Sequence, residues 1–86
     1  MARRKTQKEV DPEFELFKKK VGERMKELRL EQGYNSYEQF AFAHDIGRAQ
    51  YGKYERGTED LRLSSLYKIL RKFDVSFPDF FESLDK

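Results

Sequence analysis

Apolar residues recur at helical spacing between Asp11 and Gly33, and this periodicity constrains the fold more than any other feature. Over four turns, one apolar residue follows another after three or four positions, at Phe14, Phe17, Val21, Met25 and Leu28. Asp11 followed by Pro12 is suited to cap and begin a helix, and Gly33 is suited to end it. Nothing in the chain alternates with a period of two, so we expect an all-α protein.

Shorter helical segments follow, each with its own boundary signals. Ser36 and Gln39 have the spacing of a capping box, in which each side chain bonds the backbone N–H of the other residue. The predicted helices after the first run from Ser36 to near Asp45, from about Gly47 to Arg56, from about Leu63 to Phe73, and onward from the capping sequence Ser76-Phe77-Pro78-Asp79. The predicted fold class is a five-helix domain over residues 11–86, preceded by a basic, disordered arm at residues 1–10.

Composition excludes several classes of protein. The chain of 86 residues suffices for one core, and its eight Phe and five Tyr favour a packed fold although 40% of its residues are charged. Absence of cysteine excludes disulfides, thiol catalysis and thiolate metal sites. Since a single histidine supplies neither a nucleophile–base pair nor a metal cluster, we expect no enzyme, no metal and no cofactor. Without a run of about 20 apolar residues, we also expect no membrane span and a cytoplasmic location.

Basic residues are unevenly distributed in a chain whose net charge is only +2. Residues 1–20 carry seven Lys or Arg against four acids, and residues 21–60 carry six against eight. Within the second stretch, the segment from Gly47 to Gly57 holds Arg48, Lys53 and Arg56 but only one acid, Glu55. A locally basic helix in a nearly neutral domain is compatible with binding to nucleic acid.

Four segments, in this order, resemble the phage repressor/Cro (XRE) helix-turn-helix family. They are Val21 to Arg29, Ser36-x-x-Gln39-Phe40-Ala41, Tyr51-Gly52-Lys53-Tyr54-Glu55-Arg56-Gly57, and Leu66 to Phe80. The resemblance implies a small bacterial or phage transcriptional regulator that binds double-stranded DNA with its second and third helices. The chain departs from the family pattern in several places. Asp45 replaces the usual turn glycine, Gly47 replaces a small polar cap, the loop Gly33-Tyr34-Asn35 is one residue longer, and the usual Pro-Ser before the fourth helix is missing. Asp tolerates the left-handed backbone that such a turn requires.

In such a family the third helix enters the major groove. The resemblance assigns base reading to Arg48, Ala49 and Lys53, and Gln50 at the flank is a further candidate. We expect Tyr51 and Tyr54 to point inward and Gly52 to face outward with the reading residues. Arginine can bond guanine in a bidentate manner, alanine can contact a thymine methyl, and glutamine can read adenine.

Phosphate contacts are expected around the reading helix. Tyr37 stands at the start of the second helix, where free N–H groups favour an anion. Gly47 leaves room for close approach of the backbone to a phosphate, and Arg56 and Arg62 flank the far side. Arg29 and Glu55 match an ion pair of the family, and His44 is expected to pack in the core.

The sequence does not determine the oligomeric state of the protein. Short operators are commonly read by two-fold dimers. We hypothesise that the Phe14/Leu16/Phe17 segment packs against Phe80, Phe81 and Leu84, and that any rings left exposed form a homodimer or partner surface. The run Arg3-Arg4-Lys5 is either a minor-groove arm or a solvated tail.

An alternative to the DNA-binding regulator is a protein-interaction module such as an antitoxin or a transcriptional bridging factor. The acidic outer face at Glu23, Glu27 and Glu31 would suit a basic partner. That partner would be a toxin or a part of the transcription machinery.

Overall fold

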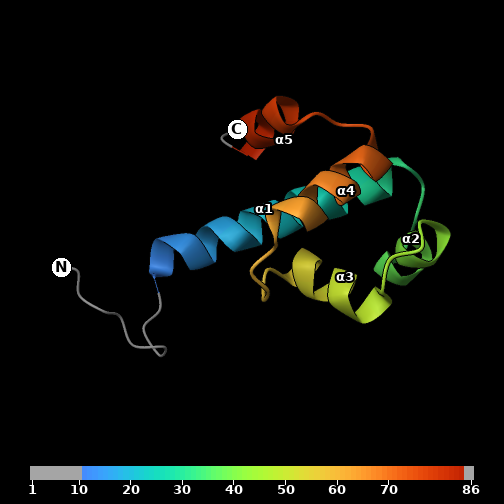
Figure 1. The fold of residues 1–86 in the computed structure, drawn as a ribbon, viewed down its shortest axis with the longest axis horizontal. Coiled ribbons are helices and arrows are strands. Elements are labelled where there is room, and N and C mark those ends of the chain that lie inside the picture. Colours follow the sequence, from blue (N-terminus) through green and yellow to red (C-terminus); the bar gives the residue numbers. More distant parts are fainter. Residues whose placement is uncertain (1–10, 85–86) are drawn as a thin grey trace.

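The structure, a computed structural model, describes residues 11–84. Those residues form five helices, α1 (Pro12–Glu31), α2 (Tyr37–Ala43), α3 (Arg48–Arg56), α4 (Leu63–Phe73) and α5 (Phe77–Leu84), and contain no strand (Figure 1). The predicted all-α, five-helix fold class is therefore confirmed. The predicted arm at residues 1–10 lies outside the described residues.

Helix α1 begins and ends where the sequence predicted. The Asp11 carboxylate accepts hydrogen bonds from the backbone N–H of Glu13, at 3.0 Å, and of Phe14, at 3.4 Å. After α1 ends at Glu31, Gly33 adopts a φ of 95°, a left-handed conformation that glycine tolerates. A capped helix of 20 residues thus provides the support on which the other helices pack.

The helix-turn-helix is formed by α2, a short turn and α3. Asp45 takes the left-handed conformation that the turn needs, with φ 58°. Ile46 N–H then donates to the Ala41 carbonyl oxygen at 2.8 Å, which closes the turn against α2. Gly47 is the N-cap of α3, as the resemblance implied, and α3 begins at Arg48.

The capping box at the start of α2 differs from its prediction in one bond. Ser36 Oγ accepts from Gln39 N–H at 3.1 Å, as expected. The Gln39 side chain, however, accepts from the backbone N–H of Asn35 at 3.2 Å and not from that of Ser36. Gln39 therefore anchors the loop before the helix, one residue earlier than the capping-box spacing predicts.

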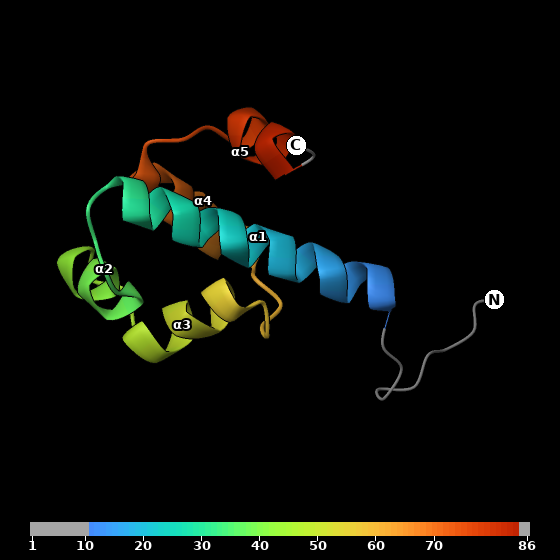
Figure 2. The same cartoon turned by 180° about the vertical axis from the view of Figure 1, so that it is seen from behind.

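The core lies between α1 on one side and α2, α3, α4 and α5 on the others (Figures 1 and 2). Met25, Phe40, Tyr51 and Phe80 are fully buried in it. Where α1 meets α3, a Cβ on Gly22 would lie 2.3 Å from the backbone oxygen of Glu55. Gly22 therefore permits direct contact between the two helix backbones, which sets how closely α3 approaches α1.

The first two turns of α1 extend the core less than the sequence predicted. Phe14, Leu16 and Phe17 remain 39%, 57% and 43% exposed. Phe17 does stack on Phe81, with 6.4 Å between ring centroids. These turns lie beyond the ends of α3 and α4, so few neighbours are available to cover them (Figures 1 and 2).

Candidate nucleic-acid interface

The buried side of α3 determines which residues its other side exposes. Tyr51 is fully buried and its ring lies 5.1 Å from that of Phe40, while Tyr54 packs at the edge of the core. Because a helix turns about 100° per residue, this orientation exposes the remaining faces of α3. The four residues predicted to read bases are all exposed: Arg48, Ala49, Gln50 and Lys53.

Gly52 was also predicted to face outward with the base-reading residues, and this prediction was wrong. Gly52 is buried. The ring of Tyr37 lies over it, so close that a Cβ at this position would lie 2.7 Å from Tyr37 Cε1. Sequence spacing placed Gly52 on the outer side of α3, but spacing along one helix does not reveal a side chain that arrives from another.

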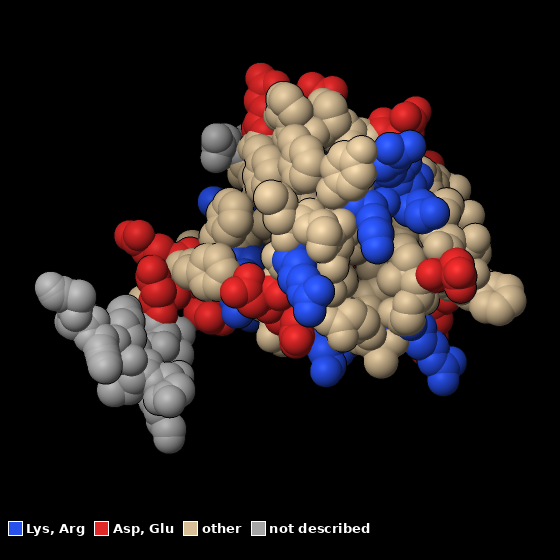
Figure 3. All heavy atoms as spheres, viewed as in Figure 1, with Lys and Arg blue, Asp and Glu red and all other residues tan. Residues whose placement is uncertain are grey.

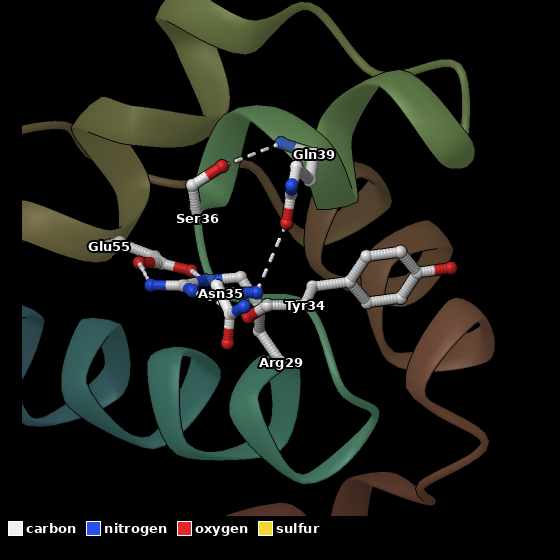
Figure 4. A network of polar contacts seen from close by, with 6 residues as sticks. All are labelled: Arg29, Tyr34, Asn35, Ser36, Gln39 and Glu55. Carbon is white, nitrogen blue, oxygen red and sulfur yellow. Dashed lines mark hydrogen bonds and ion pairs between the residues drawn. The ribbon is translucent and has the colours of Figure 1, made fainter.

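Arg29 and Glu55 form the ion pair that the resemblance implied (Figure 4). Arg29 Nε donates to Glu55 Oε2 at 2.8 Å, and Arg29 Nη2 donates to Glu55 Oε1 at 3.0 Å. Arg29 Nη1 also donates to the Tyr34 carbonyl oxygen at 2.9 Å, and the hydrogen bond with Glu55 raises the pKa of Arg29. This bidentate pair fixes the last turn of α3 to α1 and to the loop that precedes α2.

The structure brings together only two of the candidate phosphate-binding residues. Tyr37 and Arg56 meet over Gly52, since Arg56 Nη1 lies 3.2 Å from the point where a Cβ of Gly52 would stand. Gly47 is exposed at the opposite end of α3, and Arg62 is exposed at the N-cap of α4. The candidates therefore occupy three separate places around α3.

Two grooves flank α3, and of the cations that line them sequence reasoning had named only Arg56 as a phosphate contact. The groove on the α1 side, about 630 Å³, is lined in part by Lys19, Lys26, Tyr37 and Arg56. On the other side of α3, a groove of about 450 Å³ is lined by the turn and by cations of α4, Lys68, Arg71 and Lys72. No sequence signal on α3 could have identified the cations that α1 and α4 contribute, because spacing along one helix does not reveal the residues of another.

His44 has the packing role that was expected. Its ring lies 4.5 Å from that of Phe40 and 5.8 Å from that of Tyr34. Burial, and secondly the charge of Lys72, lowers the pKa of His44. Among residues 11–84 no cluster of histidine and acidic side chains could hold a metal ion. No helix in the same range is long and apolar enough to span a bilayer.

The acidic face of α1 is partly neutralised within the helix. Arg24 Nη1 lies 2.9 Å from Glu27 Oε1 and 3.8 Å from Glu31 Oε2. Two of the three carboxylates that could attract a basic partner are thus already paired. This arrangement does not favour the alternative in which the face serves as a protein-binding surface.

Comparison with known proteins agrees with this geometry. The model of the helix-turn-helix family matches residues 25–80, which include all of α2, α3 and α4. The chain belongs to the XRE-type helix-turn-helix family. It is accordingly a sequence-specific DNA-binding regulator of transcription. No curated protein matches the sequence.

Solved structures of restriction-modification controller proteins resemble this family member over most of their length. The controller C.AhdI from Aeromonas hydrophila is 30% identical, with a TM-score of 0.68, over 77% of this chain and 98% of its own. A point mutant of the controller C.Esp1396I is 33% identical, with a TM-score of 0.69, over 81% of this chain and 92% of its own. C.Esp1396I has also been solved as a tetramer in complex with its natural 35-base-pair operator. The TM-score between that structure and this chain is 0.66, over 78% of this chain and 87% of the controller chain.

Proposed function

We propose that the chain is a transcriptional controller of a restriction-modification system, acting in the cytoplasm on operator DNA without a cofactor. The observation that carries this proposal is the orientation of α3, whose exposed face bears Arg48, Ala49 and Lys53 while Tyr51 anchors the opposite face in the core. The similarity to two controllers, each covered over more than nine-tenths of its length, supports the biological setting.

Arg48 has the leading role in the proposed reading of bases. It is the first residue of α3 and is exposed, so its guanidinium would meet base edges if the N-terminal end of α3 enters the major groove. Ala49 beside it would contact a thymine methyl, and Lys53 one turn on would reach a base or a phosphate. Gln50 donates from Nε2 to the Tyr54 hydroxyl at 3.1 Å, so it must exchange this bond before it can read adenine.

Arg48→Ala should abolish the preference for guanine at one operator position. A bidentate arginine–guanine contact is worth about 1–3 kcal/mol of discrimination, so the preference should fall by about 5- to 150-fold. Selection of bound duplexes from a random-sequence pool, at two salt concentrations, measures this preference. Arg48→Lys is the matched control, because it keeps the charge and the salt dependence but loses the bidentate geometry. Recovery of the wild-type motif with Arg48→Ala would contradict the proposed role.

We further propose that a second copy of the chain packs against the exposed apolar face of α4 and α5. Leu63 and Tyr67 are 74% and 50% exposed there. Tyr67 stacks on Phe77, and Phe77 stacks on Phe81, with centroid distances of 6.2 and 6.1 Å. Figure 3 shows an uncharged area on this side of the molecule, with Lys and Arg at its margin. A continuous apolar face of this kind suits a two-fold contact, and the tetrameric C.Esp1396I complex supports an oligomer.

Tyr67→Glu should convert the dimer to a monomer, because two carboxylates would face each other near the two-fold axis of an apolar contact. Sedimentation at tens of micromolar protein should show the halved mass, and affinity for a full operator should fall by about 100-fold or more as the two half-sites become independent. Phe42→Glu is the control, since Phe42 is 89% exposed on α2 and outside this face. An unchanged mass for Tyr67→Glu would refute this dimer surface.

A further inference from the structure

Gly52 stands in the middle of α3 although its backbone does not require glycine. Its φ is not positive, and glycine within a helix costs about 0.5–1 kcal/mol relative to alanine. The requirement is one of space: a Cβ would lie 2.7 Å from Cε1 and 3.0 Å from Cζ of Tyr37. Both are rigid ring atoms, so any larger residue at this position would displace the ring.

The same contact places the Tyr37 ring beside Arg56. Arg56 Nη1 lies 3.2 Å from the position of the missing Cβ, so the ring and the guanidinium are neighbours over one glycine. Within residues 11–84, neither the Tyr37 hydroxyl nor the Arg56 guanidinium has a hydrogen-bond or ion-pair partner in the chain. A neutral donor and a cation thus stand side by side, both available to an oxygen anion.

Lys19 and Lys26 of α1 line the other side of this groove. Two acids, Glu23 and Glu55, also line the groove. Both carboxylate oxygens of Glu55 accept hydrogen bonds from Arg29, so that charge is already neutralised. Glu23 is then the one acid of the lining that opposes the cations Lys19, Lys26 and Arg56. The close approach at Gly57, where a Cβ would lie 2.8 Å from Lys19 Cα, keeps the end of α3 against α1 and so maintains this cluster. The groove therefore carries a positive charge beside the helix that would enter the major groove.

Tyr37 and Arg56 are phosphate contacts that the resemblance already led us to expect. We propose that Lys19 and Lys26 of α1 extend this site into a groove for the phosphate backbone of one DNA strand, and that Gly52 is a positioning residue that lets Tyr37 reach the phosphate. The inference rests on the proposed insertion of α3 into the major groove, because a sugar-phosphate strand then borders the helix on each side. Contacts of this kind set the register of the protein on the duplex and carry no sequence information.

A double-mutant cycle tests the role of Gly52. In the wild-type background, Gly52→Ala should weaken binding to the selected operator and to a random duplex by a similar factor, about tenfold, because a hydrogen bond to a charged group is displaced. In a Tyr37→Ala background, Gly52→Ala should have little further effect. The rigid ring is then gone, and the remaining close neighbour is Arg56 Nη1 at 3.2 Å, the end of a flexible side chain that can shift by a few tenths of an ångström. Thermal unfolding of each variant is measured alongside, and Gly52→Ala should not destabilise the Tyr37→Ala protein.

The two lysines are tested by the salt dependence of binding to the random duplex. Lys19→Gln and Lys26→Gln should each reduce the slope of log affinity against log salt by about 0.9, the value for one lost phosphate contact. Lys20→Gln is the matched control, because Lys20 is exposed next to Lys19 but does not line the groove, and its slope should equal that of the wild type.

Additive effects of Gly52→Ala and Tyr37→Ala would overturn the positioning role, and unchanged slopes for Lys19→Gln and Lys26→Gln would overturn the groove. Failure of the wild-type protein to bind any duplex at low salt would instead overturn the proposed function itself. The two kinds of failure are therefore distinguishable in one set of titrations.

Discussion

Replacing Arg29 with alanine should lower the free energy of unfolding by about 3–5 kcal/mol, because it leaves the Glu55 carboxylate buried without its partner. The two side chains are only 5% and 7% exposed, and the Tyr34 carbonyl loses its donor at the same time. Domains of this size have total stabilities of about 5–15 kcal/mol, so the variant should lose a large share of its free energy of unfolding. Urea unfolding followed by circular dichroism measures the change.

The control for this result is Arg24→Ala. Arg24 also forms an ion pair, but its partner Glu27 has a side chain that is 63% exposed, so its loss should cost at most about 1 kcal/mol. The double variant Arg29→Met/Glu55→Leu removes both charges and should recover much of the loss. A loss below about 1 kcal/mol for Arg29→Ala would show that Glu55 finds solvent once its partner is removed.

Phe40→Ala should destabilise the fold by a similar amount, about 3–5 kcal/mol, because it opens a cavity at the centre of the aromatic core. The Phe40 ring lies 4.8 Å from the ring of Phe73 and 5.1 Å from that of Tyr51, and it is fully buried. It thereby joins α2, α3 and α4. The loss should appear in urea unfolding and, because Tyr51 orients α3, also as weaker operator binding at temperatures where the variant remains folded.

Phe42→Ala provides a comparison two residues along the same helix. Phe42 is 89% exposed, so its removal should change the free energy of unfolding by no more than about 0.5 kcal/mol. Equal losses for the two variants would contradict the assignment of Phe40 to the core and of Phe42 to the surface. The contrast also isolates burial from helix propensity, since both variants make the same substitution in α2.

Helix positions could be predicted closely because their signals are local. Caps act over three or four residues, as at Asp11 and Ser36, and the left-handed conformation at Asp45 depends mainly on that residue itself. The exposure of Arg48 and Lys53 followed from the same periodicity, once Tyr51 was taken to be buried. Which bases or phosphates these side chains contact remains a prediction that the binding experiments test.

The predictions that the structure did not bear out depend instead on how separate segments of the chain pack together. Gly52 was placed outward because helical spacing describes α3 alone, whereas the Tyr37 ring that covers it comes from α2. The Phe14 and Phe17 stripe was expected to be buried because periodicity identifies an apolar face, but it does not show how far the neighbouring helices extend. Gln39 bonds Asn35 because the bend of the loop determines which N–H is within reach of its side chain.

Amino-acid order alone therefore specifies the five helices, their boundaries and the basic character of α3, since each of these depends on interactions within a few residues. Packing of the helices specifies the two grooves beside α3, the meeting of Tyr37 with Arg56, and the apolar face left exposed on α4 and α5. The physical reason is that these features depend on interhelical distances and angles. Those distances follow from contacts such as Gly22 against Glu55, in which the absence of one side chain determines how closely two backbones approach.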